Sequence, residues 1–157
     1  MRYFVVVLLC ALTACSSSSS SSGGNNGGGI VQASSGFTNA NLSGGYAFAG
    51  NGISGNSAEA SLGVITADGN GNITAGEFTA DIGGTVCHLT SLTGTYSINT
   101  NGTGTVTVNG TLDQQSINNG CTQTQSTLAL AIANGGNSIV VIGQGSQSVI
   151  SYVGIKQ

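Results

Sequence analysis

Few side chains in this sequence could carry acid–base or nucleophilic chemistry. The 157 residues include five Asp or Glu, two Lys or Arg, and one histidine, His88. Glu77 and Asp81 lie four residues apart, which on a strand separates them by about 13 Å, farther than the carboxylate pairs that cleave glycosides. Serines are numerous, but no GxSxG segment presents one as a nucleophile. We therefore expect no enzymatic activity.

The charge balance argues against a second class of function, nucleic-acid binding. Besides Arg2 near the start of the chain, Lys156 is the sole Lys or Arg in the sequence. A surface with so little positive charge cannot neutralise a phosphate backbone, and it lacks the basic clamp used in phosphoryl transfer. We expect no nucleic-acid partner and no cofactor.

A twelve-residue segment, TADGNGNITAGE, resembles the calcium-binding loop of EF-hand proteins. Asp68, Asn70 and Asn72 fall at the third, fifth and seventh positions of that loop, and Glu77 falls at the twelfth. The first ligand position, however, holds Thr66. The flanking segments alternate like strands, whereas an EF-hand loop joins two helices. Because a hairpin turn explains the Asp-Gly and Asn-Gly pairs without an ion, we expect no metal here, with calcium as the alternative.

The start of the chain carries an export signal. Arg2 precedes an apolar run, FVVVLLCAL, which is far shorter than the roughly 20 residues that span a bilayer and is typical of a secretory signal. The run leads into Leu12-Thr13-Ala14-Cys15, which resembles the lipobox of bacterial lipoprotein precursors: an aliphatic residue, two small residues and an obligatory cysteine. This resemblance implies that residues 1–14 are a signal peptide and that Cys15 becomes a lipidated N-terminus.

The same resemblance gives a location and a domain layout. Two or more long acyl chains hold a protein on a membrane almost permanently. Ser16 is not the aspartate that retains some lipoproteins at the inner membrane, so we expect the outer membrane. Residues 15–29 comprise the lipidated cysteine and a Ser-, Gly- and Asn-rich run, typical of a flexible tether about 20 Å long. Residues 30–157 should then form a single β domain.

Export also decides how the four cysteines are used. Cys10 would leave with the signal peptide and Cys15 would carry the lipid. This leaves Cys87 and Cys121 in a compartment where disulfides persist, and we expect these two cysteines to be bonded. The closed loop would stabilise the fold by about 3 to 4 kcal/mol. A metal site that includes His88 would need further ligands, so we interpret this histidine as a surface residue.

Apolar and polar residues alternate along most of the domain, which is the pattern of half-buried strands. Val106, Val108 and Leu112 share one face of such a run, and Asn109 lies among threonines on the other. Pairs of Asn-Gly or Asp-Gly separate the runs, as in tight hairpins. The pattern predicts about eight antiparallel strands with short connections, at residues 44–52, 58–67, 72–82, 91–99, 103–113, 126–133, 138–144 and 147–155.

Eight short antiparallel strands can close into a barrel or form two packed sheets. The chain contains no proline, and Lys156 is the only Lys or Arg of the domain. Proline and lysine are the residues that usually protect exposed strand edges, and a closed barrel has no edges to protect. We therefore predict an all-β fold, a small antiparallel barrel of about eight strands, with a two-sheet β-sandwich as the alternative.

Two strand–turn–strand pieces, LxGxYxF at 42–48 and DGxGxI at 68–73, extend the resemblance to the domain itself. They are similar to segments of the uncharacterised β-rich lipoproteins that occur in many copies in some soil-type bacteria. The resemblance implies an extracytoplasmic β domain, and that family carries no activity over to any residue here.

Two functions are open on this basis. We slightly prefer a surface interaction or envelope-structural module that presents a Thr-, Asn- and Gln-rich face to glycans or envelope proteins, which a contiguous exposed apolar patch would support. The alternative is lipocalin-like binding of a small apolar ligand, which an interior cavity of roughly 300 Å³ or more would favour. The candidate lining residues, which we expect simply to fill the core if there is no cavity, are Tyr46, Phe48, Phe78, Tyr96 and Tyr152.

Overall fold

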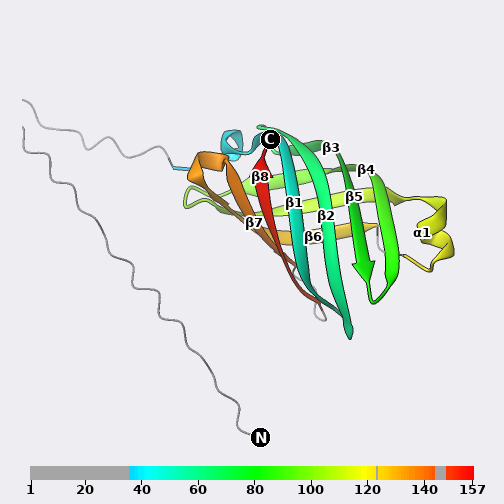
Figure 1. Ribbon diagram of the computed structural model, residues 1–157. Helices are drawn as coiled ribbons and strands as arrows, with labels where there is room; N and C mark the ends of the chain where they lie inside the picture. Colours follow the sequence, from blue (N-terminus) through cyan, green and yellow to red (C-terminus); the bar gives the residue numbers. More distant parts are fainter. Residues whose placement is uncertain (1–35, 123, 144–147) are drawn as a thin grey trace, which may run out of the picture. The chain divides into compact units, whose positions relative to one another are not determined.

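The domain folds as an all-β barrel (Figure 1). A computed structural model describes residues 36–122, 124–143 and 148–157, all of which fall in the compact unit Gln32–Gln157. The predicted signal peptide, Cys15 and the tether lie outside the described residues. The strands are β1 (Ser43–Ser54), β2 (Ser57–Asp68), β3 (Asn72–Ile82), β4 (Thr85–Ile98), β5 (Thr103–Leu112), β6 (Gln125–Ala133), β7 (Ser138–Gly143) and β8 (Ser148–Lys156).

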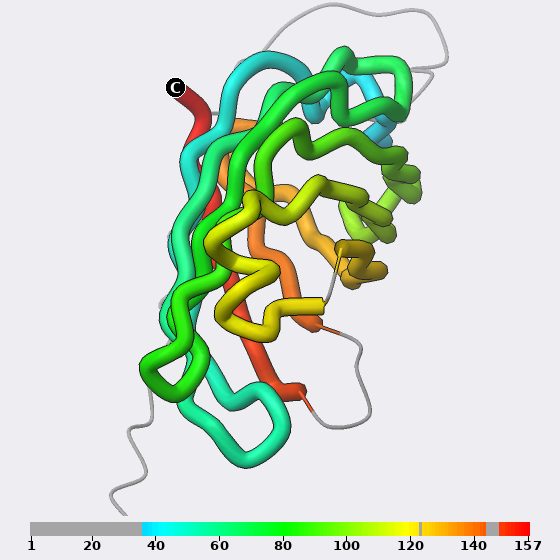
Figure 2. Tube along the Cα trace, turned by 90° about the vertical axis from the view of Figure 1, so that its right-hand side faces the viewer, coloured from blue at the N-terminus to red at the C-terminus, as the bar shows by residue number. Residues whose placement is uncertain are grey.

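Each strand pairs antiparallel with the next one in the chain, and β8 returns to pair with β1. The closing register runs from Tyr46 opposite Lys156 to Ser54 opposite Ser148. All eight strands therefore belong to one closed barrel, as predicted, and the two-sheet sandwich is not adopted. Figure 2 shows the strands from the end of the barrel that carries the short helix.

One end of the barrel is closed by packed side chains and two 3-10 turns, η1 (Asn39–Asn41) and η2 (Asn134–Gly136). The hydroxyl of Tyr46, which is completely buried, donates to the carbonyl of Gly136 at 2.6 Å. The hydroxyl of Tyr96 donates to the carbonyl of Leu42, also at 2.6 Å. These hydrogen bonds anchor the two connecting segments on the buried core.

The connection at the other end contains a five-residue helix, α1 (Gln114–Asn118), which the alternation pattern does not predict. Asp113, placed by the sequence at the end of a strand, is instead the N-cap of α1, and its carboxylate accepts a hydrogen bond from the backbone N–H of Ser116. No helix in the described part of the chain is long and apolar enough to cross a membrane.

Strand β4 also differs from the prediction, because it begins at Thr85 and not at residue 91. Its pairing with β5 shifts register between Thr90 and Thr93, and Ser91 within the shift has φ 53°. The inward phase therefore changes from Leu89 to Leu92, so the first half of the strand does not continue the alternation of the second half.

Candidate ligand-binding cavity

The half of the barrel nearest α1 is hollow. Its cavity has a volume of about 770 Å³ and is lined by residues from all eight strands. The strand residues that line it are mostly apolar; they include Ile65, Leu92, Val106, Val108, Leu128, Ile139, Val141 and Ile150. A volume of this size lies within the range of small-molecule sites.

Three aromatic rings form one wall of the cavity. Phe48 stacks on Phe78 with ring centroids 6.0 Å apart, and Tyr152 meets both rings edge-on at 6.0 and 6.1 Å. Two glycines make room for these rings. A Cβ on Gly50 would lie 2.3 Å from the Tyr152 ring, and a Cβ on Gly63 would lie 2.6 Å from the Phe48 ring. Inward glycines on β1 and β2 therefore allow large rings to lie against the strands.

A carboxyl group stands beside this apolar wall. Glu59 on β2 is 6 % exposed, and it is the one charged side chain among the described residues that line the cavity. The phenol of Tyr152 donates to the Glu59 carboxylate at 3.4 Å. Burial raises the pKa of Glu59, and the hydrogen bonds from Tyr152 and Ser61 offset part of that rise. Burial, with the nearby Glu59, raises the pKa of Tyr152 to about 12.

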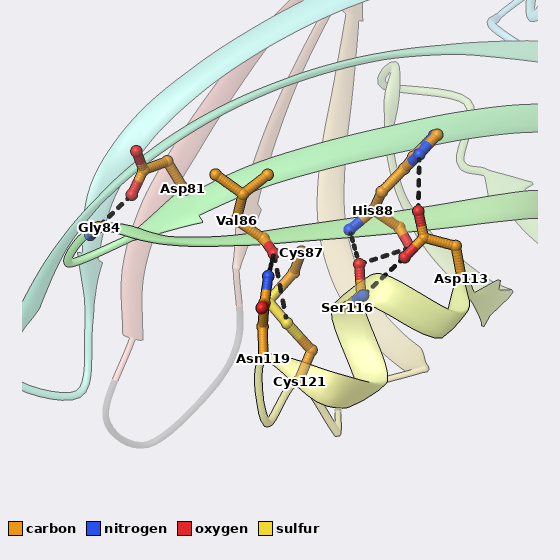
Figure 3. Close-up of a disulfide and its surroundings, with 9 residues drawn as sticks. All are labelled: Asp81, Gly84, Val86, Cys87, His88, Asp113, Ser116, Asn119 and Cys121. Carbon is orange, nitrogen blue, oxygen red and sulfur yellow. Dashed lines mark hydrogen bonds and ion pairs between the residues drawn. A yellow bond between two sulfur atoms is a disulfide. The ribbon is translucent and has the colours of Figure 1, made fainter.

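The predicted disulfide between Cys87 and Cys121 forms at the mouth of the cavity, with the two Cα atoms 5.9 Å apart (Figure 3). Both cysteines line the cavity, together with Asn119 and Gly120 from the segment after α1. The side-chain amide of Asn119 donates to the carbonyl of Val86 at 3.2 Å. The disulfide and this hydrogen bond therefore hold the α1 segment against β4 at the rim.

A serine, a histidine and an aspartate also meet at the rim, but not in a catalytic arrangement. His88 Nδ1 lies 3.5 Å from Asp113 Oδ2. The Ser116 hydroxyl accepts a hydrogen bond from the backbone N–H of His88 at 2.7 Å and donates to its carbonyl at 3.4 Å (Figure 3). Catalysis would require the serine hydroxyl to bond to the imidazole ring. Here it bonds to the backbone, so the three residues fasten α1 to β4.

The calcium-like segment forms a turn that satisfies its own carboxylate. Asp68 Oδ1 accepts the backbone N–H groups of Asn70 at 2.7 Å and Asn72 at 3.0 Å, and Oδ2 accepts the Asn72 side-chain amide at 2.7 Å. Those bonds, the side-chain one first, lower the pKa of Asp68. Glu77 lies within β3 opposite Val64, away from the turn. Within the described residues, no group of three or more His, Cys, Asp or Glu could hold a metal ion.

The five aromatic residues considered as ligand-lining candidates divide between the two halves of the barrel. Phe48, Phe78 and Tyr152 line the cavity, whereas Tyr46 and Tyr96 belong to the packed core at the closed end. Sequence reasoning missed Glu59. Its signal was present, because Glu59 has the same alternation phase as the inward residue Ile65, and an acid in that phase must be buried.

No family model, no curated protein and no solved structure matches this chain.

Proposed function

We propose that the domain binds a small apolar ligand inside the barrel. The observation that carries this proposal is the cavity of about 770 Å³ with its apolar lining. It exceeds the 300 Å³ that would favour ligand binding, so our preference moves from the interaction module to the ligand-binding alternative. The disulfide and α1 lie at the rim, where a ligand would enter.

The contrast between the two halves supports this function. At the closed end, Tyr46 and Leu42 are at most 1 % exposed, and the barrel is filled. Toward α1, Phe48 and Phe78 are partly exposed although they point inward. Protein interiors are close-packed, and a void of this size removes contacts that would stabilise the fold. A bound ligand would restore these contacts.

A cavity-filling variant tests the proposal. Ala80 on β3 lines the cavity and is 3 % exposed, so Ala80→Phe would place a ring in the ligand space. The matched control is Thr79→Leu, which changes the adjacent side chain on the outward face of the same strand. The full chain with Cys15→Ser avoids detergent that could occupy the cavity. The probe is the neutral dye N-phenyl-1-naphthylamine, whose fluorescence rises in apolar surroundings.

We expect the parent chain and Thr79→Leu to bind the dye equally and Ala80→Phe to bind it at least tenfold more weakly. Val141→Phe, which fills the cavity from β7, should repeat this loss if Ala80→Phe fails to fold. Equal dye binding in the cavity-filling and control variants would contradict the proposal, because the dye would then bind elsewhere.

A second candidate function, surface interaction, is favoured by a different observation. An apolar row crosses the outside of five strands through paired residues, from Leu62 on β2 to Ala131 on β6; the members between them are Ala49, Val153 and Val140. Leu62 and Val153 are 64 % and 57 % exposed. The row is about 20 Å wide, and none of its side chains is charged. Exposed apolar patches of this kind mark interaction sites.

We infer that the partner of this outer face is a second copy of the chain. A face without charge has nothing to repel an identical face, and a two-fold contact lets each copy cover the other's apolar row. Val153→Lys would place like charges across such a contact, whereas Thr105→Lys adds the same charge outside the row. Sedimentation velocity should show a dimer for the parent and Thr105→Lys and a monomer for Val153→Lys. A monomeric parent at all concentrations would contradict self-association.

We also propose that the domain is lipid-anchored to a bacterial membrane, most simply the outer membrane, through Cys15. The support is the segment Leu12-Thr13-Ala14-Cys15 after a short apolar run. Cells fed radioactive palmitate should label the parent chain and not Cys15→Ser. Label in both chains, or in neither, would contradict this anchor.

A further inference from the structure

Glu59 lines the cavity, and no Lys, Arg or His of the described residues pairs with it. Its carboxylate is buried within the barrel and accepts a hydrogen bond from the neutral phenol of Tyr152 at 3.4 Å. Among the described residues, the ion pair that forms is the one between His88 and Asp113, and Glu59 takes part in none. A buried carboxylate without a cation is costly, and residues of this type are almost never buried unless paired.

The neighbours of Glu59 do not explain its presence by packing. On the adjacent strands it lies opposite Gly52 of β1 and Ile82 of β3, neither of which can bond to a carboxylate through its side chain. Ser61, two residues along β2, offers its hydroxyl to the Glu59 carboxylate and also lies 3.5 Å from the carbonyl of Gly50, but it brings no charge. Two hydroxyl groups hydrogen-bond to the carboxylate but do not balance its charge, so the buried carboxyl group points to a cationic ligand.

We propose that the ligand is an apolar amine whose protonated nitrogen pairs with the Glu59 carboxylate. This inference rests on the proposed ligand-binding function and names the chemical class that the cavity takes. The apolar body of the ligand would contact the aliphatic lining from β4 to β7. The nitrogen would lie beside the three-ring wall of Phe48, Phe78 and Tyr152, whose faces attract cations within about 6 Å.

The pH dependence of binding follows from the groups around Glu59. From β8 the one facing titratable group is Tyr152, which stays neutral because its pKa is about 12. The described residues that face Glu59 from β1 and β3 carry no titratable group, and Cys87 and Cys121 are bonded. Amine binding should therefore strengthen as pH rises and Glu59 loses its proton, until the amine itself begins to lose its charge.

The experiment compares three ligands with the same twelve-carbon chain. Dodecylamine, dodecan-1-ol and dodecanoate, each below its aggregation limit, displace N-phenyl-1-naphthylamine from the full chain carrying Cys15→Ser. At neutral pH we expect the amine to bind at least tenfold more tightly than the alcohol, and dodecanoate to bind most weakly. In Glu59→Gln the affinity for dodecylamine should fall to the affinity for dodecan-1-ol. The affinity for dodecan-1-ol should be the same as in the parent chain.

If Glu59→Gln does not fold, ligand affinities measured over a series of pH values on the chain that keeps Glu59 give a second test. The affinity for the amine should rise up to tenfold per pH unit and then level off, while that for the alcohol stays constant. Equal affinities for amine and alcohol, or tighter binding of dodecanoate, would overturn the assignment while leaving an apolar-ligand cavity intact. Failure of all three ligands and of the dye would instead contradict the proposed function itself.

Discussion

The phenol of Tyr152 and the carboxylate of Glu59 meet inside the barrel at 3.4 Å, although 93 residues separate them in the chain. The contact exists because β8 closes onto β1, which brings the last strand within one strand of β2. It places a polar pair at the edge of an otherwise apolar wall made by Phe48 and Phe78. The closure of the barrel therefore places the polar contact between Tyr152 and Glu59 beside the apolar wall of the cavity.

The first prediction concerns the cost of holding Glu59 in this position. Burial raises the pKa of Glu59 above 4.5, the ordinary value of a glutamate side chain. The folded state therefore binds the proton more tightly than the unfolded state does. The contribution of Glu59 to stability is therefore most favourable below about pH 4.5 and falls as pH rises through its folded pKa. Each unit by which the pKa is raised corresponds to about 1.4 kcal/mol.

Urea denaturation of the parent and Glu59→Gln at a series of pH values measures this effect. The free energy of unfolding of the parent, relative to that of Glu59→Gln, should decrease from pH 4 upward and then become constant. Subtracting the free energy of unfolding of Glu59→Gln from that of the parent cancels the contributions of exposed groups such as Asp68. The lowered pKa of Asp68 gives the opposite pH trend, and it does so in both proteins. A difference that is flat or increases with pH would show that Glu59 is not desolvated.

The second prediction concerns the disulfide at the rim. Cys87 and Cys121 are 34 residues apart, so the cross-link should stabilise the protein by about 3 to 4 kcal/mol. Reduction should lower the free energy of unfolding by that amount, and it should also speed the exchange of the bound dye because the α1 segment is released at the mouth. The double variant Cys87→Ser/Cys121→Ser, as control, should show both changes without reductant and respond no further to it. Unchanged dye exchange after reduction would mean that α1 does not gate entry.

Much of the fold follows from the sequence because the alternation of apolar and polar residues shows which face of each strand is buried. The alternation around Val106 and Val108 and the Gly-containing turns predict eight antiparallel strands, and the scarcity of edge-protecting residues favours closure. The bond between Cys87 and Cys121 follows from counting the cysteines that would remain if the chain were exported and processed as the sequence predicts. The cavity could not be predicted, because a filled barrel and a hollow one require the same alternation.

Strand β4 shows the limit of this reasoning. Cys87 and Leu89 point inward, and so do Leu92 and Tyr96, but the bulge at Ser91 shifts the two halves by one residue. A search of the sequence for one unbroken alternation of inward and outward residues therefore finds the second half of β4 and misses the first. The helix α1 is not predicted for a different reason, because five residues are too few to show a helical period. The N-cap at Asp113 is the available sequence signal for this helix.

The third prediction tests that bulge. Ser91 has φ 53°, a left-handed conformation that costs a residue with a Cβ about 1 to 2 kcal/mol. Ser91→Gly should therefore raise the free energy of unfolding by about 1 kcal/mol, less whatever the glycine loses in chain entropy. Ser91→Val, which adds a branched side chain in the same conformation, should lower it by more than that. If both variants unfold at the parent's urea concentration, the bulge is not strained.

The fourth prediction distinguishes the two ends of the barrel by their tyrosines. The hydroxyls of Tyr46 and Tyr96 each donate to a backbone carbonyl at 2.6 Å in the packed core. Removing either one leaves a buried acceptor without its donor, so Tyr46→Phe and Tyr96→Phe should each cost about 1 to 3 kcal/mol.

Tyr152→Phe is the matched control, because its hydroxyl makes a longer contact of 3.4 Å at the edge of the cavity. At pH 4, below the raised pKa of Glu59, it should cost less than 1 kcal/mol in urea unfolding, yet at neutral pH it should be the one tyrosine variant that changes dodecylamine affinity. The closed end would then be a structural anchor and the hollow end a binding site. Equal losses of stability in all three variants, with equal effects on the amine, would mean that the barrel is one continuous core and that this division does not hold.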